Sequence, residues 1–284
     1  MSELELREAA TLVVLRDANS KAAPKLEVLL LRRRAGSAFA GGASVFPGGA
    51  VDRSDREPAT ASLSAGLDDR EASRLLGVDS GGLGYFVAAI RECFEEAGLL
   101  FAGDSAGLVS FADPATRERY ARHRGSLNGG GTTLAAICRS EGLLLAVDRF
   151  RYLSHWITPL GSPRRYDTRF FVAVVPENQH ALHDDAEVVA SEWVVPSEAL
   201  ARHHAGELSL MLPTVKHLEA LSGCSNAQEF WDSAATEITA IEPRINVQGS
   251  VVRILLPGDA GFDAATGLPD GMAFPDGSRE AGGG

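Results

Sequence analysis

The sequence predicts an α/β protein, because short strand-forming runs alternate with segments of helical periodicity. The clearest strand signals near the N-terminus are Thr11–Arg16 and Leu26–Leu31. The clearest helix signal begins at Tyr85, where apolar residues recur at offsets of three and four through Val87, Ile90, Phe94 and Ala97. No internal repeat interrupts this pattern, so the fold is not a repeat array.

The N-terminal third of the chain predicts a hairpin, a glycine-rich turn and an insertion. The first two strands flank a polar loop with Asn19, Ser20 and Pro24, which is typical of a β-hairpin. A stretch rich in Gly and Ala then leads to the turn Pro47-Gly48-Gly49. Over about 53–84 the composition shifts to Asp, Ser, Arg and Gly, with one short helical pattern near Leu67–Leu76. We interpret this segment as an insertion, for which a surface excursion without chemistry is the simplest alternative.

The remaining elements follow from the same signals of periodicity, caps and breakers. We expect helices at Pro114–Arg124, Thr133–Leu145, Ser197–His204, Leu210–Leu221 and Ala227–Ala235. We expect strands at Phe150–Thr158, Phe170–Val175, Val188–Val195, Glu237–Pro243 and Val251–Leu256. These elements predict a main domain at 9–222, a helix and strand extension at 223–257, and a flexible tail at 258–284.

Composition and charge narrow the class of protein. The chain has 284 residues, of which 45% are hydrophobic and 23% charged, as is ordinary for a globular protein. Its net charge of -11 argues against a nucleic-acid partner, and no apolar run is long enough to span a membrane. The three cysteines show neither zinc spacing nor a disulfide framework. We therefore expect a cytoplasmic protein that acts on a small molecule, with homodimer formation left open.

Three carboxylates on the helix that follows Tyr85 are the main functional signal. Glu92, Glu95 and Glu96 lie at offsets of three and four, on the side opposite the apolar stripe. Like charges this close repel by a few tenths of a kcal/mol per pair. A hard divalent cation such as Mg2+ or Mn2+ would remove the repulsion, since it takes oxygen ligands. The alternative is a solvated helix face with ordinary ion pairs, such as Arg91 with Glu95.

The segment Arg91-Glu92-Cys93-Phe94-Glu95-Glu96-Ala97-Gly98-Leu99 resembles the second half of the Nudix box, R-E-U-x-E-E-x-G-U. Gly49 resembles the glycine that opens the box, and Asp55 stands six residues later, where the full pattern has Glu. The gap from there to Arg91 is far longer than the pattern allows. The chain therefore resembles a Nudix hydrolase whose box is split by an insertion.

This resemblance implies a mixed β-sheet between helices (α/β/α) and a metal-dependent attack of water on a phosphoanhydride. Glu92, Glu95 and Glu96 would bind Mg2+ or Mn2+, and Glu92 would also serve as the base, directly or through a metal-bound water. Such a reaction needs no covalent nucleophile. Consistently, the sequence has no Gly-x-Ser-x-Gly elbow and no phosphate-binding loop ending in Gly-Lys-Ser/Thr.

The resemblance also implies roles for residues around the carboxylates. Arg91 would hold the carboxylates in position, and Gly98 would end the helix in a left-handed conformation. Gly48 and Gly49 would form the tight turn that brings the preceding strand to the helix. Glu187, in an acidic loop before a strand, is a second candidate for the base, since in many Nudix enzymes a Glu from a late loop joins the metal site or acts as base. The alternative is an ordinary solvated loop.

The substrate is indicated by a weaker resemblance. The run from Leu30–Ala35 to Phe46–Gly49 resembles the element before the box in coenzyme A diphosphatases, although Ala38 and Phe39 stand where that element has its middle arginine. The long split in the box and the segments 156–159 and 165–171 are similar to the subgroup with the animal organellar coenzyme A diphosphatase.

Coenzyme A or acyl-coenzyme A is therefore the leading substrate, cleaved to phosphopantetheine, or its acyl form, and adenosine 3',5'-bisphosphate. Arg34 and Arg165 are the candidates for binding its phosphates. An ADP-sugar or dinucleotide pyrophosphatase is the alternative within the family. A nucleotide-binding regulatory module without hydrolysis is the alternative of another class.

Overall fold

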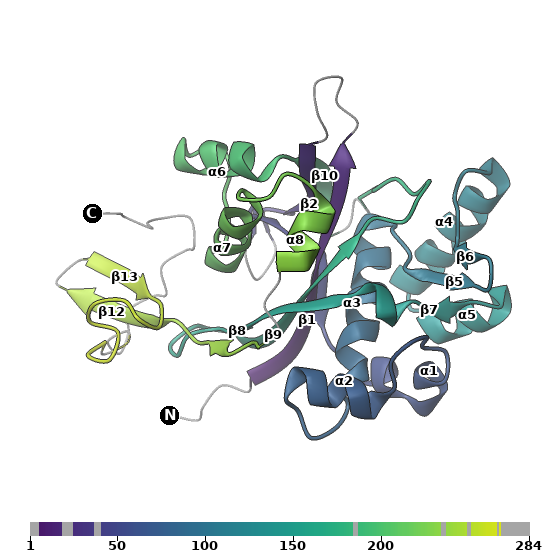
Figure 1. Ribbon diagram of the computed structural model, residues 1–284, viewed down its shortest axis with the longest axis horizontal. Coiled ribbons are helices and arrows are strands. Elements are labelled where there is room, and N and C mark those ends of the chain that lie inside the picture. Colours follow the sequence, from purple (N-terminus) through teal and green to yellow (C-terminus); the bar gives the residue numbers. More distant parts are fainter. Residues whose placement is uncertain are drawn as a thin grey trace.

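The computed structural model describes residues 6–18, 25–36, 41–183, 187–233, 237–248, 251–265 and 267. These residues form a central mixed β-sheet with helices on both faces, so the predicted α/β/α architecture is confirmed (Figure 1). Most of the segment expected to be a flexible tail, 258–284, lies outside the described residues, as do Asp184 and Asp185 of the acidic loop.

The main sheet is built around two long neighbouring strands that run parallel. β1 (Leu6–Ala18) pairs in parallel with β9 (Arg165–Val174), from Leu6 opposite Arg165 to Leu15 opposite Val174. The expected hairpin is present, since β1 pairs antiparallel with β2 (Lys25–Arg33). In order, the sheet contains β10 (Val188–Val194), β2, β1, β9, β8 (Arg151–Ile157) and β11 (Ala240–Ile241).

Two very short strands attach the glycine segment to this sheet. β3 (Ser44–Val45) pairs with β2, and β4 (Gly48–Ala50) pairs with the N-terminal half of β1. The prediction of a tight turn at Gly48 and Gly49 is therefore wrong, because both residues lie in β4 and neither has a positive φ. Glycine is required there for close approach: a Cβ on Gly48 would lie 2.6 Å from the Ala10 carbonyl oxygen.

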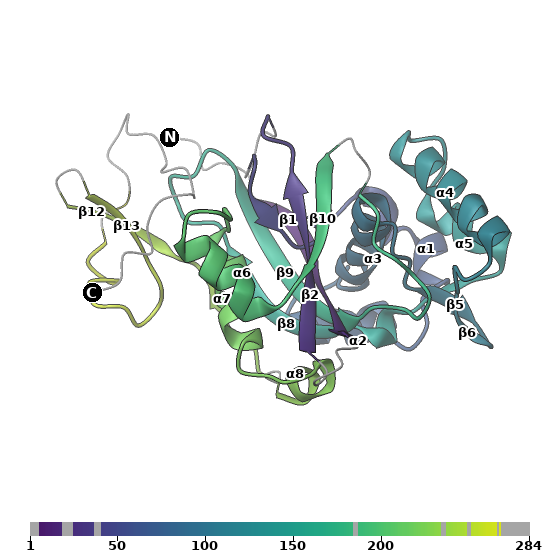
Figure 2. The same ribbon diagram turned by 90° about the horizontal axis from the view of Figure 1, so that it is seen from above.

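The two faces of the sheet bury different helices (Figures 1 and 2). Side chains alternate along β1, so Leu12 and Val14 face α3 (Leu83–Ala97), whereas Val13 and Leu15 face the opposite core. The opposite core is closed by α6 (Pro196–His204), α7 (Leu212–Leu221) and α8 (Ala227–Ser233). The α3 side also holds α1 (Pro58–Ala61), α2 (Asp69–Leu76), α4 (Pro114–Asn128), α5 (Leu134–Glu141) and the 3-10 turns η1 (Arg53–Arg56) and η2 (Val147–Arg149).

Helix α3 is buried more completely than its sequence pattern predicts. Every residue of α3 is buried except Glu92 and Glu95. The apolar stripe packs on the sheet, with the rings of Phe86 and Phe171 4.4 Å apart, while α2 and α4 pack on the helix from outside. Gly98 is the C-cap with φ of 70°, the left-handed conformation expected of it.

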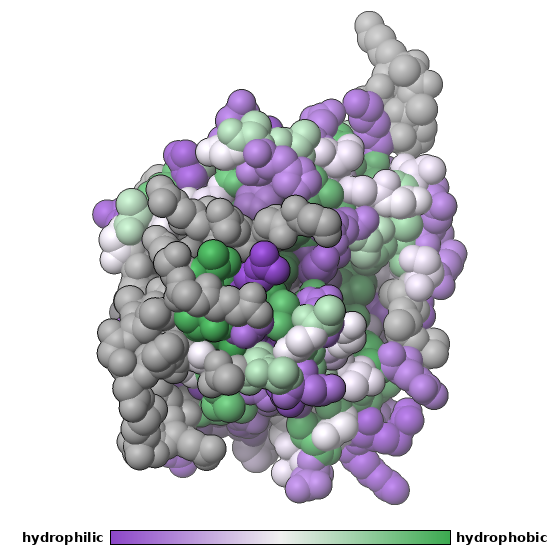
Figure 3. Space-filling view, turned by 90° about the vertical axis from the view of Figure 1, so that its left-hand side faces the viewer, coloured by the Kyte–Doolittle hydropathy of each residue, from purple (hydrophilic) through white to green (hydrophobic). Residues whose placement is uncertain are grey.

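The chain beyond residue 222 contributes to the main body as well as extending from it. Ala227 and Phe230 of α8 are buried with α6 and α7, and β11 pairs with β8 at the sheet edge. β12 (Arg244–Gln248) and β13 (Val251–Leu255) form a separate two-stranded sheet that projects from the body (Figure 2). Hydrophilic and hydrophobic residues are interspersed over the described part of this end of the molecule (Figure 3).

A second small sheet joins the segments on either side of α4 and α5. It consists of β5 (Ala102–Asp104), β6 (Gly107–Leu108) and β7 (Leu144–Leu145). The sequence did not predict these strands because two or three residues carry no detectable periodicity. Across the described part of the chain, no helix combines the length and apolarity needed to cross a bilayer.

The buried His217 makes stability depend on pH in a predictable direction. Its Nδ1 donates to the Pro213 carbonyl (2.6 Å), and the Ser154 hydroxyl donates to its Nε2 (2.7 Å), so the ring is neutral. Burial lowers the pKa of His217 from 6.5 to about 4. The unfolded chain therefore binds a proton first as pH falls below 6.5, and stability is lost towards pH 4.

We expect His217→Gln to remove this part of the pH dependence. Urea unfolding of both proteins between pH 7 and pH 4 checks it. The wild type should lose on the order of 3 kcal/mol more unfolding free energy than the variant over that range. A difference between the two proteins that stays constant with pH would contradict a neutral buried ring.

Candidate active site

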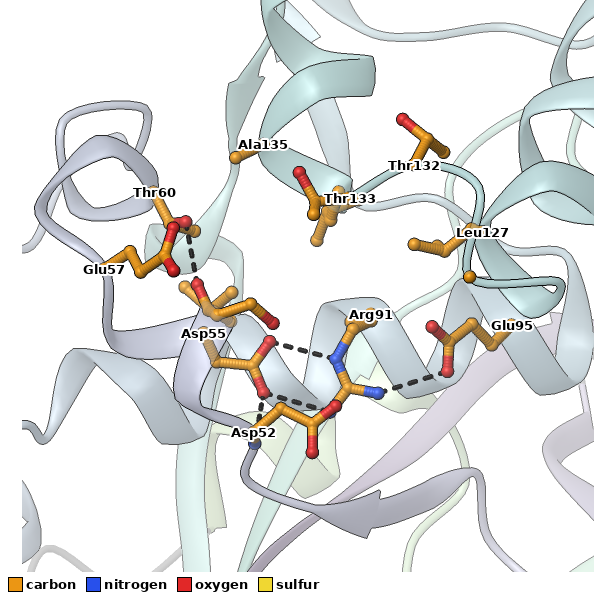
Figure 4. Close-up of a pocket in the computed structure, with 14 residues that line it drawn as sticks. Asp52, Asp55, Glu57, Thr60, Arg91, Glu95, Leu127, Thr132, Thr133 and Ala135 are labelled. Carbon is orange, nitrogen blue, oxygen red and sulfur yellow. Dashed lines mark hydrogen bonds and ion pairs between the residues drawn. The ribbon is translucent and has the colours of Figure 1, made fainter.

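The guanidinium of Arg91 is the centre of the site (Figure 4). Its Nε and Nη2 donate to the two carboxylate oxygens of Asp55, each at 2.9 Å. Its Nη1 donates to Glu92 (2.9 Å) and Glu95 (3.1 Å), and Nη2 also donates to the Ala50 carbonyl (2.9 Å). All five N–H donors of this side chain therefore have acceptors. Arg91 therefore binds two of the three carboxylates of α3, those of Glu92 and Glu95.

Asp55 reaches Arg91 across 36 residues of sequence. It belongs to η1, the first turn of the insertion, and is only 3% exposed. Its carboxylate also accepts the Asp52 amide at 2.8 Å, which closes the turn. Burial raises the pKa of Asp55, while the bonds from Arg91 oppose that rise. In the sequence, only the position of Asp55, six residues after Gly49, pointed to this residue. The insertion that follows does not separate Asp55 from Arg91.

The residue after Asp55 anchors the insertion on the other side of α3. Arg56 Nη1 lies 2.5 Å from a carboxylate oxygen of Glu8, whose second oxygen accepts the Tyr85 hydroxyl at 2.7 Å. The Arg56 Nε also donates to the Gly81 carbonyl (3.4 Å). The insertion is therefore bound to both β1 and α3, and is not a surface excursion detached from the site.

Glu92 and Glu96 are packed against the glycine strand. Glu96 is 4% exposed and accepts the Gly48 amide at 2.9 Å. A Cβ on Gly49 would lie 2.4 Å from Glu92 Oε1, so any other residue there would displace the Glu92 carboxylate. Burial raises the pKa of Glu92 to about 7 and that of Glu96 well above its usual value, and mutual repulsion adds to the rise at Glu96. Burial therefore favours the neutral form of both carboxyl groups unless a further positive charge lies beside them.

Arg33 and Glu187 complete the cluster from the edge of the sheet. The Arg33 guanidinium pairs with Glu187 and has Nη1 3.8 Å from Glu96 Oε1. Arg33 therefore connects Glu187 to Glu96 of α3. Arg34, expected to bind phosphate, is exposed and donates its amide to the Glu187 carbonyl (3.0 Å).

Sequence reasoning selected Arg34 and missed Arg33. The alternation of side chains along β2 could have identified Arg33. Leu29 and Leu31 face α3, and Arg33 lies on the same side of the strand. The second phosphate candidate, Arg165, also has a different place. It donates to the Thr158 carbonyl (3.0 Å) and to Glu242 (2.5 Å), so its described contacts are not with the α3 carboxylates.

The donor set fits a hard divalent cation in residue type and charge. Glu92, Glu95 and Glu96 supply carboxylate oxygens within two turns of one helix. Burial is the main cause of the raised pKa values of all three, so a negative charge is costly there unless a positive charge lies beside it. In the residues the structure describes, however, no three His, Cys, Asp or Glu side chains converge on one point. Glu92 and Glu95 point to Arg91 instead, so binding a cation would require them to turn.

Comparison with known proteins agrees with this site. The model of the NUDT19 Nudix domain matches residues 68–221, more than half of the chain. The chain belongs to the Nudix hydrolase family. The family resemblance drawn from the interrupted box is thereby confirmed, and the chain lies near the NUDT19 subgroup. Nudix hydrolases generally use divalent metals and act on small nucleotide substrates.

Curated relatives include three proteins named acyl-coenzyme A diphosphatase NUDT19. The Xenopus laevis protein is 27% identical over 226 residues, which cover 69% of this chain but only 59% of that protein. The Gallus gallus protein is 26% identical, covering 78% of this chain and 70% of the relative. The Homo sapiens protein is 28% identical, covering 82% and 71%.

A solved structure supports the fold at higher identity. The NUDIX hydrolase from Alicyclobacillus acidocaldarius is 30% identical, with a TM-score of 0.65. The match covers 82% of this chain and 99% of that one. The Nudix fold therefore extends over most of the chain, including the interrupted box.

The dependence of Arg91 on Asp55 can be tested by comparing two neighbouring aspartates. Asp55→Ala should lower the unfolding free energy by about 3–5 kcal/mol, because it leaves a buried guanidinium with an unpaired side. Asp52→Ala is the matched control: its side chain is 62% exposed and lies 3.7 Å from Arg91, so its loss should be at most about 1 kcal/mol. Urea unfolding measures the loss of unfolding free energy in each variant. Equal losses would show that the bidentate pair of Asp55 and Arg91 stabilises the protein no more than the exposed Asp52 does.

Proposed function

We propose that this protein hydrolyses the phosphoanhydride of coenzyme A or acyl-coenzyme A. The products would be phosphopantetheine, or its acyl form, and adenosine 3',5'-bisphosphate. The observation that carries this proposal is the set of α3 carboxylates organised by Arg91 within a Nudix box. The choice of coenzyme A is supported by the activity for which the relatives are named and by the sequence element before the box.

We infer that Glu92, Glu95 and Glu96 hold Mg2+ or Mn2+. When bound, the ion would lower the pKa of the attacking water and neutralise charge that develops on the pyrophosphate. The protein prepares this arrangement in two ways. Gly48 fixes one oxygen of Glu96 through its amide, and Arg91 keeps Glu92 and Glu95 on the same side of the helix.

Two residues can accept the proton of the attacking water in this proposal. The Glu187 side chain is 52% exposed, so water reaches it directly. Glu92 is closer to the centre of the cluster, and its pKa of about 7 suits a base at neutral pH. Loss of turnover in Glu187→Gln with unchanged Mn2+ affinity would assign the base to Glu187; unchanged turnover would assign it to Glu92.

Removing single carboxylate charges tests the metal assignment. Glu95→Gln and Glu96→Gln should each reduce turnover about a hundredfold or more, equivalent to roughly 3 kcal/mol in the barrier. Each should also weaken Mn2+ binding measured by calorimetry. Glu118→Gln on α4 is the control, since that side chain is 75% exposed and pairs with Arg122. Full activity with both Glu95 and Glu96 replaced would exclude them as ligands.

The substrate class requires a direct comparison. We expect coenzyme A and acyl-coenzyme A to have a higher kcat/KM than ADP-ribose and NADH in the presence of Mn2+, with products identified by mass. Preference for ADP-ribose or NADH would favour an ADP-sugar or dinucleotide pyrophosphatase. Tight binding without turnover of any of the four would favour a regulatory module.

A further inference from the structure

A cavity of about 180 Å³ opens beside Arg91 (Figure 4). One wall is formed by the insertion, including Glu57. The facing wall is formed by the end of α4 and the start of α5, including Leu127 and Thr132. Glu95 lies on the floor and also binds Arg91, so the cavity adjoins the carboxylate cluster directly.

The lining of this cavity does not suit a phosphate. Among the described residues that line it, Arg91 is the one basic side chain, and all its donors are used by acceptors of the protein. Four acidic residues line it, namely Asp52, Asp55, Glu57 and Glu95, and Leu127 and Leu134 contribute apolar surface. Carboxylates and threonine hydroxyls accept hydrogen bonds. The cavity is therefore suited to an uncharged chain that carries N–H or O–H donors.

We propose that this cavity binds the uncharged, amide-bearing arm of the substrate, the part attached to the phosphate distant from adenosine. The inference rests on the proposed function, in which that arm is pantetheine. A volume of about 180 Å³ equals that of roughly six water molecules, so the cavity holds a segment of the arm and leaves its end outside. An acyl group on the thiol would then extend towards solvent.

This placement gives the insertion a role in recognition. The residues that interrupt the box supply one wall, whereas the carboxylates that perform the chemistry lie on α3. The arm and the pyrophosphate would thus be bound by different elements that meet at Arg91. Changes in the wall should alter binding of the arm without altering binding of the nucleotide.

Filling the cavity tests the proposal, with the two halves of coenzyme A used as separate ligands. Thr132→Trp should weaken binding of 4'-phosphopantetheine roughly tenfold or more, since the ring occupies the space of the arm. Binding of adenosine 3',5'-bisphosphate should stay within about twofold of the wild type. Calorimetry in the presence of Mn2+ measures both. Ala136→Trp is the matched control, because Ala136 is exposed on α5, four residues beyond Thr132, and does not line the cavity.

The outcomes separate two questions: whether this cavity binds the arm, and whether coenzyme A is the substrate. Unchanged phosphopantetheine binding in Thr132→Trp, or loss of adenosine bisphosphate binding instead, would overturn the assignment of the cavity. Loss of Mn2+ binding in Glu57→Gln would overturn it in favour of a cation site. Wild-type turnover of ADP-ribose but not coenzyme A would refute the proposed substrate itself. If Thr132→Trp does not fold, Glu57→Trp fills the cavity from the exposed side of the opposite wall.

Discussion

The bidentate pair between Arg91 and Asp55 is the interaction on which the rest of the site depends. A guanidinium that is 8% exposed is costly to bury unless every donor is matched. Here the acceptors come from three separate parts of the chain: β4 through Ala50, the insertion through Asp55, and α3 itself through Glu92 and Glu95. One side chain therefore fixes the distance between strand, insertion and helix.

The close approach of β4 to α3 sets the electrostatics of the site. Because Gly48 and Gly49 lack side chains, the Gly48 amide and the backbone at Gly49 reach Glu96 and Glu92. The same approach removes water from both carboxylates and raises their pKa values. A site assembled this tightly favours a positive charge more strongly than an exposed row of glutamates would. Burial therefore strengthens the requirement for a cation that the sequence spacing first suggested.

Local patterns in the sequence predicted the core of the fold and the carboxylate helix, but not the contacts between distant segments. The period of α3, its end at Gly98 and the β1–β2 hairpin are local features. The bond between Asp55 and Arg91 depends on how the chain folds between two residues that are 36 positions apart. Arg33 was missed for a different reason: it stands in a run of three arginines, and only the alternation of β2 distinguishes its side from that of Arg34.

An insertion in the middle of a catalytic motif is tolerated here because its ends are fixed by the site. The entropy cost of closing a loop grows only with the logarithm of its length, so lengthening the gap is a small penalty once both ends are anchored. Asp55 and Arg56 anchor its beginning to Arg91 and Glu8, and its end continues directly into α3. Between these anchors, α2 is held by its packing on α3, and the exposed residues of the insertion can vary with less effect on the carboxylates. Recognition of the substrate can therefore change in the insertion while the chemistry on α3 stays the same.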